Sequence, residues 1–269
     1  MKYVVVALRF AALCAVIRWT ILFELRLLHP QSCNASLLRT RNHFACTPRP
    51  SGSRVLGSGA VFFDVDGVLI DSLTAKGEAF ANLFPAQYRQ DVMDFHSANG
   101  GLNRVEKIAR ISCEIVGVDL SDNELNTLVD TFSSVVRERV FAADEIPGAT
   151  PALAAVSKRV PIHAVSAVPT SEVVDVLQHH NMLHFFTSVH GGPNPKDATI
   201  VSLTQQYRYD ASQCLFVGDS LHDRDAALEA GIPFIFVRSG EQSAPPEAVC
   251  VIDDLRGLDS RVAELMTGG

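Results

Sequence analysis

The pattern of apolar and polar positions first predicts a short buried strand at residues 61–63. This segment is rich in Val and Phe, and glycines bound it on both sides. Two carboxylates one residue apart, Asp64 and Asp66, follow the strand, and Gly67 comes next. Because ligands bind beyond the carboxyl ends of strands in open parallel sheets, these carboxylates are placed for chemistry. An acidic turn of this kind can also be a simple solvated turn, so the rest of the chain has to decide.

From Leu73 the apolar positions change to helical spacing. The expected helices cover residues 73–84, 87–96, 103–116 and 122–140. The last of these has the clearest start, because Ser121 and Glu124 form a capping box and the following apolar residues trace one helix face. Residues 72–144 are therefore predicted to be an all-helical insertion without strands.

Beyond Gly148 the pattern alternates between short apolar runs and helical segments. The expected strands cover residues 160–165, 185–189, 214–217, 233–237 and 249–252, and helices are expected over 150–158, 170–180, from 196, over 221–230 and at the C-terminus. Strands that alternate with helices of this length imply βαβ units and a parallel sheet covered on both faces. We therefore predict a Rossmann-like α/β core formed by residues 58–71 and 145–269, with the all-helical cap domain of residues 72–144 inserted into it.

The charge of the chain is divided unevenly. At 269 residues, with 47% hydrophobic and 20% charged residues, the chain has an ordinary globular composition. Residues 1–57 hold eight basic residues against Glu24 alone, a net charge of +7, so residues 58–269 carry −14. An acidic body argues against nucleic acid as a partner, because binding to phosphate backbones needs clustered Lys and Arg.

The first 57 residues read as a leader that is separate from the fold. Residues 3–28 are mostly apolar, but Arg9 and Arg18 interrupt them, so the free energy of membrane insertion sums to near zero. Residues 25–63 are rich in Ser, Arg, Pro and Gly and, as in an organellar transit peptide, poor in acids. We expect a targeting or disordered leader, with import into a plastid or mitochondrion and a cytoplasmic location as the alternative. Membrane contact is expected only through this leader.

Polar side chains that suit a phosphate and a metal ion follow several of the predicted strands. They are Asp64, Asp66, Ser166, Lys196, Asp219 and Asp223. Mg²⁺ prefers a few carboxylates together with water and phosphate oxygens, so Asp64, Asp66 and Asp219 are expected to hold this ion. Ser166 and Lys196 can bind the remaining phosphate oxygens through a hydroxyl group and an ammonium group. Taken alone, Ser166 would be a core hydroxyl and Lys196 an ordinary lysine at a helix start.

Four segments in this order resemble the motifs of the haloacid dehalogenase superfamily of phosphatases. They are Asp64–Val68, Ser166, Lys196 and Gly218–Asp223. The resemblance covers residues 58–255, and the helical insertion is similar to the cap of the phosphoglycolate-phosphatase and β-phosphoglucomutase type. The sequence departs from the family at Ala167, where many members carry Asn or another polar residue, and this departure leaves the substrate open.

The resemblance also implies a role for each matching residue. Asp64 would be the nucleophile that forms an aspartyl-phosphate, and Asp66 would be the general acid and then the general base. Asp219 would bind the metal directly, whereas Asp223 would support the shell of ligands around it. The presence of Asp66 argues against true dehalogenation, because the dehalogenases of this family lack an acid at that position.

A polar loop inside the predicted cap is a candidate for substrate specificity. It carries Asn99 and Arg104 between apolar helices, and a cap must close over the rim of the sheet. Such a loop can equally be a solvated connection between helices. We therefore expect either a substrate-reading lid or an ordinary surface loop.

The sequence thus predicts an Mg²⁺-dependent phosphomonoester hydrolase whose partner is a small-molecule phosphate ester of the sugar phosphate or phosphoglycolate type. A phosphomutase of the β-phosphoglucomutase type shares every core residue and is the first alternative. The second is a non-catalytic binding protein with the same fold, although an unused cluster of four carboxylates would carry a cost in repulsion. The sequence specifies no oligomeric state.

Overall fold

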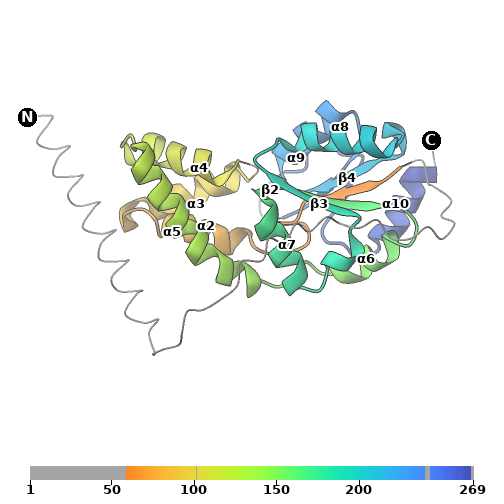
Figure 1. Cartoon of the computed structure of the whole chain (residues 1–269), viewed down its shortest axis with the longest axis horizontal. Coiled ribbons are helices and arrows are strands. Elements are labelled where there is room, and N and C mark those ends of the chain that lie inside the picture. Colours follow the sequence, from red (N-terminus) through yellow and green to blue (C-terminus); the bar gives the residue numbers. More distant parts are fainter. Residues whose placement is uncertain (1–58, 101, 240–242, 268–269) are drawn as a thin grey trace, which may run out of the picture.

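The computed structural model describes residues 59–100, 102–239 and 243–267. The predictions for the leader, residues 1–57, lie outside this range. Within the described ranges, no helix has both the length and the apolar character needed to cross a bilayer. The described chain forms a sheet sandwiched by helices and, beside it, a separate group of helices (Figure 1).

The sheet has six parallel strands in the order β3-β2-β1-β4-β5-β6. These strands are β1 (Val61–Phe63), β2 (Ile162–Pro169), β3 (Ser188–Gly192), β4 (Leu215–Gly218), β5 (Phe234–Val237) and β6 (Cys250–Ile252). Its covering helices are α6 (Ala149–Val156), α7 (Thr170–His179), α8 (Lys196–Tyr207), α9 (Leu221–Ala230) and α10 (Leu258–Thr267). Helices α8 and α9 lie on one face and α6, α7 and α10 on the other (Figure 1). The predicted Rossmann-like α/β fold is therefore confirmed.

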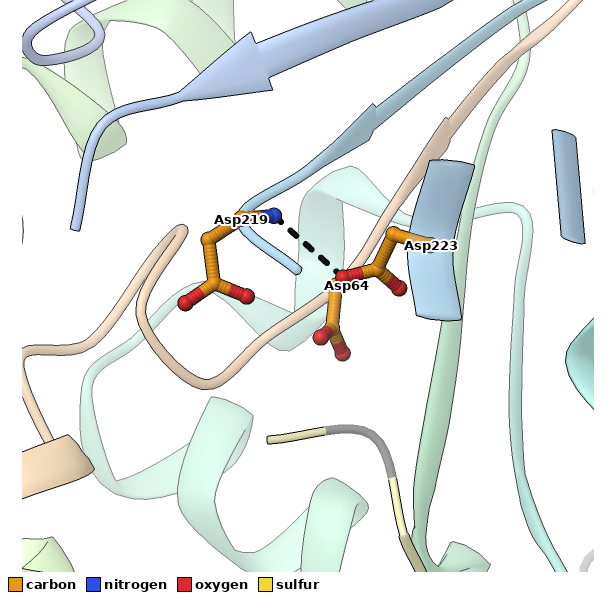
Figure 2. Close-up of side chains that lie close together, drawn as sticks. All are labelled: Asp64, Asp219 and Asp223. Atoms are coloured by element: carbon orange, nitrogen blue, oxygen red, sulfur yellow. Dashed lines mark hydrogen bonds between the residues drawn. The ribbon is translucent and has the colours of Figure 1, made fainter. Parts of the chain in front are cut away.

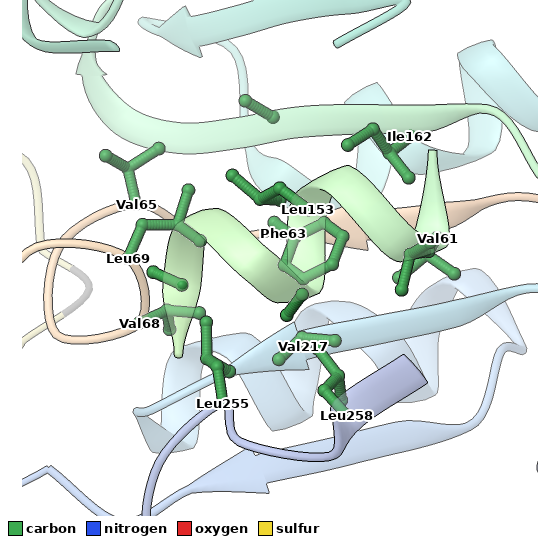
Figure 3. Packing of buried hydrophobic residues seen from close by; sticks show 14 of the residues in the cluster. Val61, Phe63, Val65, Val68, Leu69, Leu153, Ile162, Val217, Leu255 and Leu258 are labelled. Atoms are coloured by element: carbon green, nitrogen blue, oxygen red, sulfur yellow. The ribbon is translucent and has the colours of Figure 1, made fainter. Parts of the chain in front are cut away.

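Strand β1 lies in the middle of the sheet because all three of its side chains are apolar. Val61 and Phe63 belong to one buried hydrophobic cluster, which includes residues of α6, α7 and α10 (Figure 3). Phe62 points to the opposite face and joins the cluster formed with α8 and α9. A strand with apolar residues on both sides is stable only when both faces are covered, so β1 occupies the centre. The residues that follow it therefore emerge at the middle of the sheet edge.

The chain between β1 and α6 forms the helical insertion. Its helices are α2 (Leu73–Ala81), η1 (Ala86–Tyr88), α3 (Arg89–Ala98), α4 (Arg104–Arg110), η2 (Ile111–Val116) and α5 (Asp122–Phe141). They enclose a hydrophobic cluster of their own, in which the rings of Phe80 and Phe132 stack with centroids 4.1 Å apart. The predicted capping box of Ser121 and Glu124 is present at the start of α5.

One predicted strand begins later than the sequence pattern suggests. Leu183–Phe185 forms a 3₁₀ turn, and the strand expected from residue 185 starts at Ser188 instead. Phe186 packs edge-on against Phe63, with ring centroids 6.3 Å apart. The apolar residues of this turn therefore cover one face of the sheet instead of forming a strand. Apolar character alone does not distinguish such a turn from a strand.

The helical insertion joins the sheet through two adjacent chain segments and rests on α7. The segments are linked by hydrogen bonds from Asp71 N to Asp144 O at 2.8 Å and from Ile146 N to Leu69 O at 2.9 Å. Ion pairs of Arg104 with Glu172 and of Arg137 with Asp175 connect the insertion to α7, and the ring of Phe141 stacks on His179 at 4.6 Å. These contacts hold the insertion over the edge of the sheet where β1 ends.

We predict that Leu153→Ala lowers the free energy of unfolding by about 2–5 kcal/mol, because the Leu153 side chain is fully buried beneath β1 and its removal leaves a cavity. Urea denaturation measures this change. Leu228→Ala is the matched control, since Leu228 is 53% exposed on α9. An equal loss in both variants would contradict the central place assigned to this core.

Candidate active site

Asp64 occupies the position directly after β1 and is buried. Its Oδ1 accepts a hydrogen bond from Val65 N at 2.7 Å, and its Oδ2 lies 2.8 Å from Lys196 Nζ. Burial raises the pKa of Asp64 to about 7; the Lys196 ammonium opposes this shift, whereas Asp223 and Asp66 add to it. The carboxylate is therefore fixed in place and only partly compensated in charge.

Asp219 follows β4 directly, and Asp223 lies in the first turn of α9. Ser220 caps this helix, and Asp223 closes the capping box: its Oδ2 accepts from Ser220 Oγ at 2.6 Å and from Ser220 N at 3.1 Å. Figure 2 shows the further bond from Asp219 N to Asp223 Oδ2, at 3.3 Å. A Cβ at Gly218 would lie 2.4 Å from Asp223 Cβ, so only glycine lets the strand approach this close.

The carboxylates of Asp64, Asp219 and Asp223 form one cluster, in which an oxygen from each lies within 4.8 Å of the others (Figure 2). Burial raises the pKa of Asp219 well above its usual range, and Asp223 and Asp64 raise it further. A set of oxygen donors with excess negative charge fits a hard divalent cation such as Mg²⁺. These residues can therefore hold the metal that the sequence predicts.

Asp66 lies apart from this cluster in its side-chain contacts. Its Oδ1 accepts a hydrogen bond from Ser72 Oγ at 2.5 Å, and its Oδ2 pairs with Lys76 Nζ. Burial raises the pKa of Asp66, but the charge and hydrogen bonds of Lys76, together with Ser72, outweigh burial and lower it overall. The sequence prediction of Asp66 as a metal ligand thus stays a prediction, because both carboxylate oxygens have these other partners.

Gly67 allows the turn after β1 to pass close to the carboxylate cluster. Its φ of +75° is in the left-handed region that favours glycine. A Cβ at this position would lie only 2.1 Å from Asp219 Oδ2. The glycine of the Asp-x-Asp-Gly segment therefore suits the turn and leaves room for the Asp219 carboxylate beside it.

Lys196 and Ser166 lie on the side of Asp64 that faces β2 and α8. Lys196 is the first residue of α8, and its Nζ contacts Asp64 Oδ2 and, at 2.6 Å, Asp223 Oδ1. Burial lowers the pKa of Lys196, but Asp223 and Asp64 outweigh burial and raise it overall, so the ammonium stays charged. Ser166 is buried on β2, where its Oγ accepts from Val168 N at 3.2 Å. An ammonium thus contacts the Asp64 carboxylate, and a buried hydroxyl lines the same cavity.

A cavity of about 390 Å³ lies between these residues and the helical insertion. Asp64, Ser166 and Lys196 contribute to its lining, as do residues of α2, α4 and α5. Near this cavity the end of the loop after α3 approaches the segment after β4, since a Cβ at Gly100 would lie 3.6 Å from Ser220 Cβ. The arrangement can enclose a small phosphate ester with its phosphate on the sheet side and its remaining atoms on the helical side.

The structure separates the two residues proposed for cap specificity. Arg104 lines the cavity, where it bonds Ser133 and Glu172 and lies over the ring of Phe132. Asn99 is not among the lining residues, and its amide donates to Phe95 O at 2.9 Å at the end of α3. Asn99 is thus engaged in ending a helix, whereas Arg104 borders the space for substrate.

Reasoning from the sequence missed two lysines that line the cavity, Lys76 and Lys107. Lys76 contacts Asp66 only because α2 runs back past the end of β1, which no local pattern reveals. Lys107 did leave a signal, since it is one turn from Ile111 on the apolar face of its helix. A lysine on a buried helix face indicates either a paired charge or a functional one.

Comparison with known proteins agrees with this geometry. A model of the haloacid dehalogenase-like hydrolase family matches residues 61–237, which is more than half of the chain. The chain is 27% identical over 212 residues to a phosphoglycolate phosphatase of Pseudomonas fluorescens, covering 74% of this chain and 77% of that protein. It is 25% identical over 193 residues to a 6-phosphogluconate phosphatase of Escherichia coli, covering 69% of this chain and 85% of the relative.

A solved structure gives the same result for the fold. The crystal structure of a predicted phosphoglycolate phosphatase from Haemophilus somnus superposes with a TM-score of 0.63 at 20% sequence identity, and the match covers 78% of this chain and 99% of that one. The matched family region begins at β1 and ends with β5, so it contains every residue of the carboxylate cluster. The chain therefore belongs to the haloacid dehalogenase-like hydrolase family.

Proposed function

We propose that this hydrolase cleaves phosphate monoesters of small hydroxylated metabolites, with Asp64 as the nucleophile. One observation carries the proposal: Asp64 is fixed at the end of the central strand, with Lys196 beside it and Ser166 bordering the same enclosed cavity. The similar proteins named above, a phosphoglycolate phosphatase and a 6-phosphogluconate phosphatase, support the same reaction class. Both enzymes are named after a substrate that is a phosphate ester of a hydroxy acid.

The proposed reaction has two halves. First, a carboxylate oxygen of Asp64 attacks phosphorus, the bond from phosphorus to the ester oxygen breaks, and the leaving alkoxide takes a proton from Asp66. Water then attacks the phosphorus of the aspartyl-phosphate and gives a proton to Asp66. Inorganic phosphate leaves, and the carboxylate of Asp64 is restored. Ser166 and Lys196 bind phosphate oxygens throughout.

The contacts of Asp66 favour its role as a base in the second half. Lys76 and Ser72 stabilise its ionised form, and an ionised carboxylate can accept the proton of the attacking water. To act first as an acid, Asp66 has to carry a proton that these partners disfavour. Rotation away from Lys76 toward the leaving oxygen would raise its proton affinity. We therefore propose that Asp66 serves both steps, with the contact to Lys76 broken in the first.

Mg²⁺ is the proposed cofactor, held by Asp64 and Asp219 with Asp223 in the same cluster. When bound, the ion supplies positive charge that offsets the repulsion between these carboxylates and the substrate phosphate. Asp223 is already bonded by Ser220 and Lys196, so its part is to hold Lys196 and the loop after β4 in place. This division agrees with the supporting role implied for Asp223 by the family resemblance.

We predict that Asp64→Asn lowers kcat for phosphate ester hydrolysis by several orders of magnitude, because an amide cannot form the covalent intermediate. Release of inorganic phosphate from 2-phosphoglycolate and a panel of sugar phosphates, with Mg²⁺ present, measures the effect. Asp225→Asn is the matched control: the Asp225 side chain is 59% exposed on α9 and its variant should keep wild-type activity.

The same assay separates the alternatives. No turnover of any ester by the wild type, or equal turnover by Asp64→Asn, would refute the proposed hydrolysis. Conversion of a hexose 1-phosphate to its isomer without release of free phosphate would instead identify a mutase.

The raised pKa of Asp64 predicts how stability depends on pH in metal-free protein. The carboxyl ionises near pH 4 in the unfolded chain but only near pH 7 in the folded one. Between these values the unfolded state loses its proton first, so this group's contribution to stability falls as pH rises and is fully lost above pH 7. Asp64→Asn has no carboxyl group here, so it does not bear the cost of burying this negative charge above pH 7. We therefore expect the variant to have a higher urea midpoint than wild type at pH 8, and a smaller difference at pH 5.

Urea denaturation in a chelating buffer tests this expectation, with Asp225→Asn as the control that should follow wild type at both pH values. Added Mg²⁺ should raise the wild-type midpoint at pH 8 and raise that of Asp64→Asn less, because only the folded wild type offers the full set of carboxylates. Identical urea midpoints of wild type and Asp64→Asn at both pH values would show that burial does not raise the pKa of Asp64.

A further inference from the structure

Lys107 places a buried ammonium group on the helical side of the cavity. The residue lies on α4 in the helical insertion (Figure 1), is only 2% exposed, and lines the cavity opposite the sheet. Its Nζ donates a hydrogen bond to His96 Nδ1 at 3.1 Å and lies 5.2 Å from the centre of the Phe80 ring. A neutral imidazole and an aromatic face offset only part of the cost of burying a full charge.

The other cations that line the cavity all have carboxylate partners. These ion pairs are Lys76–Asp66, Arg104–Glu172, Arg137–Asp175 and Lys196–Asp64. Among the described residues, Lys107 has no carboxylate within ion-pair distance. An unpaired buried charge is costly and is retained where a ligand completes it. Lys107 is thus the one lining cation of the described chain that still lacks an anion.

His96 holds the ammonium in place. Its Nε2 lies 3.2 Å from Leu73 O, and its Nδ1 faces Lys107. Burial, with Lys107 and Lys76 adding to it, lowers the pKa of His96 to about 3, so the ring is neutral. The proton is then on Nε2, which donates to the Leu73 carbonyl, while Nδ1 accepts from Lys107. The ring therefore uses one of the three N–H donors of the ammonium.

The protonation of Lys107 is coupled to the binding of an anion beside it. Burial and the positive charge of Lys76 lower the pKa of Lys107, whereas Asp66 and Asp219 raise it, and together they leave it at about 7. A bound anion would shift the pKa upward in the same way. Proton binding and anion binding at Lys107 therefore reinforce each other.

We propose that Lys107 binds a second anionic group of the substrate, a carboxylate, and that the enzyme consequently prefers phosphorylated hydroxy acids to phosphorylated alcohols. This inference rests on the proposed phosphatase function and adds a binding residue to it. A single ammonium carries one positive charge and has donors to spare, which matches the single charge and two oxygens of a carboxylate. A second phosphate group, with a larger charge, would need more than one cation.

Two matched pairs of substrates test the proposal on the full chain with Mg²⁺. 3-Phosphoglycerate and glycerol 1-phosphate differ only in a carboxylate against a hydroxymethyl group, as do 2-phosphoglycolate and 2-hydroxyethyl phosphate. The quantity compared is the ratio of kcat/KM for the acid to kcat/KM for the alcohol. We expect wild type to favour the acid and Lys107→Met to lower the ratio by roughly 10- to 150-fold, the range set by a hydrogen bond between charged groups.

Two further variants make the test decisive. Lys107→Gln removes the charge but keeps an N–H donor for His96 Nδ1, so it should lower the ratio as Lys107→Met does even if the Met variant folds poorly. Arg110→Met removes a cation from the outer side of the same helix, where Arg110 pairs with Glu114, and should keep the wild-type ratio.

The outcomes distinguish this inference from the function on which it rests. A wild-type ratio in an active Lys107→Gln or Lys107→Met enzyme would overturn the assignment of Lys107 alone. Wild type that turns over the alcohols as well as the acids would overturn it too. If wild type hydrolysed none of the four esters but did hydrolyse sugar phosphates of the panel described above, the inference would fail and the proposed function would stand. No turnover of any ester would refute both.

Discussion

Three buried carboxylates lie together at the end of the central strand with a single ammonium beside two of them, and the rest of the structure serves to make this arrangement possible. Lys196 contacts Asp64 and Asp223 but leaves Asp219 without a cationic partner among the described residues. Such crowding is unfavourable in a site shielded from water, as the raised pKa values of Asp64 and Asp219 show. The fold imposes it by pairing β1 directly with β4, so that the residues after both strands are neighbours. The apolar residues on both faces of β1 stabilise that pairing.

The helical insertion turns this charged edge into an enclosed site. Two ion pairs and a stacked ring hold it against α7, and Lys76 reaches from its first helix to Asp66. The proton affinity of Asp66 therefore depends on how the insertion is seated. Burial strengthens charge interactions, including the ion pair of Lys196 with Asp64 at the base of the cavity. The position of the insertion and the charge of Asp66 are in this way linked through Lys76.

The two sides of the cavity offer different chemistry to a ligand. The sheet side presents a carboxylate, a hydroxyl, an ammonium and a cluster suited to a divalent cation, all of which suit a phosphate and its metal ion. The helical side combines aromatic and aliphatic side chains with polar and cationic ones, and among its cations Lys107 is buried and has no carboxylate partner in the described chain. A ligand that fills both sides carries a phosphate at one end and, by our proposal, a carboxylate at the other. The hydroxy acid esters in the names of the similar proteins have both groups.

The sequence by itself determined the fold and most of the sheet side of the site. Apolar runs and capping signals act over a few residues, so they predicted the strands and helices, and the parallel sheet then brought Asp64 and Asp219 to one edge. Only the tertiary structure decided that Asp66 is bonded by Lys76, that Asn99 ends a helix away from the cavity, and that Lys107 faces it. Periodicity shows which face of a helix is buried. It does not show which charge from a distant segment meets that face, because packing between helices fixes those partners.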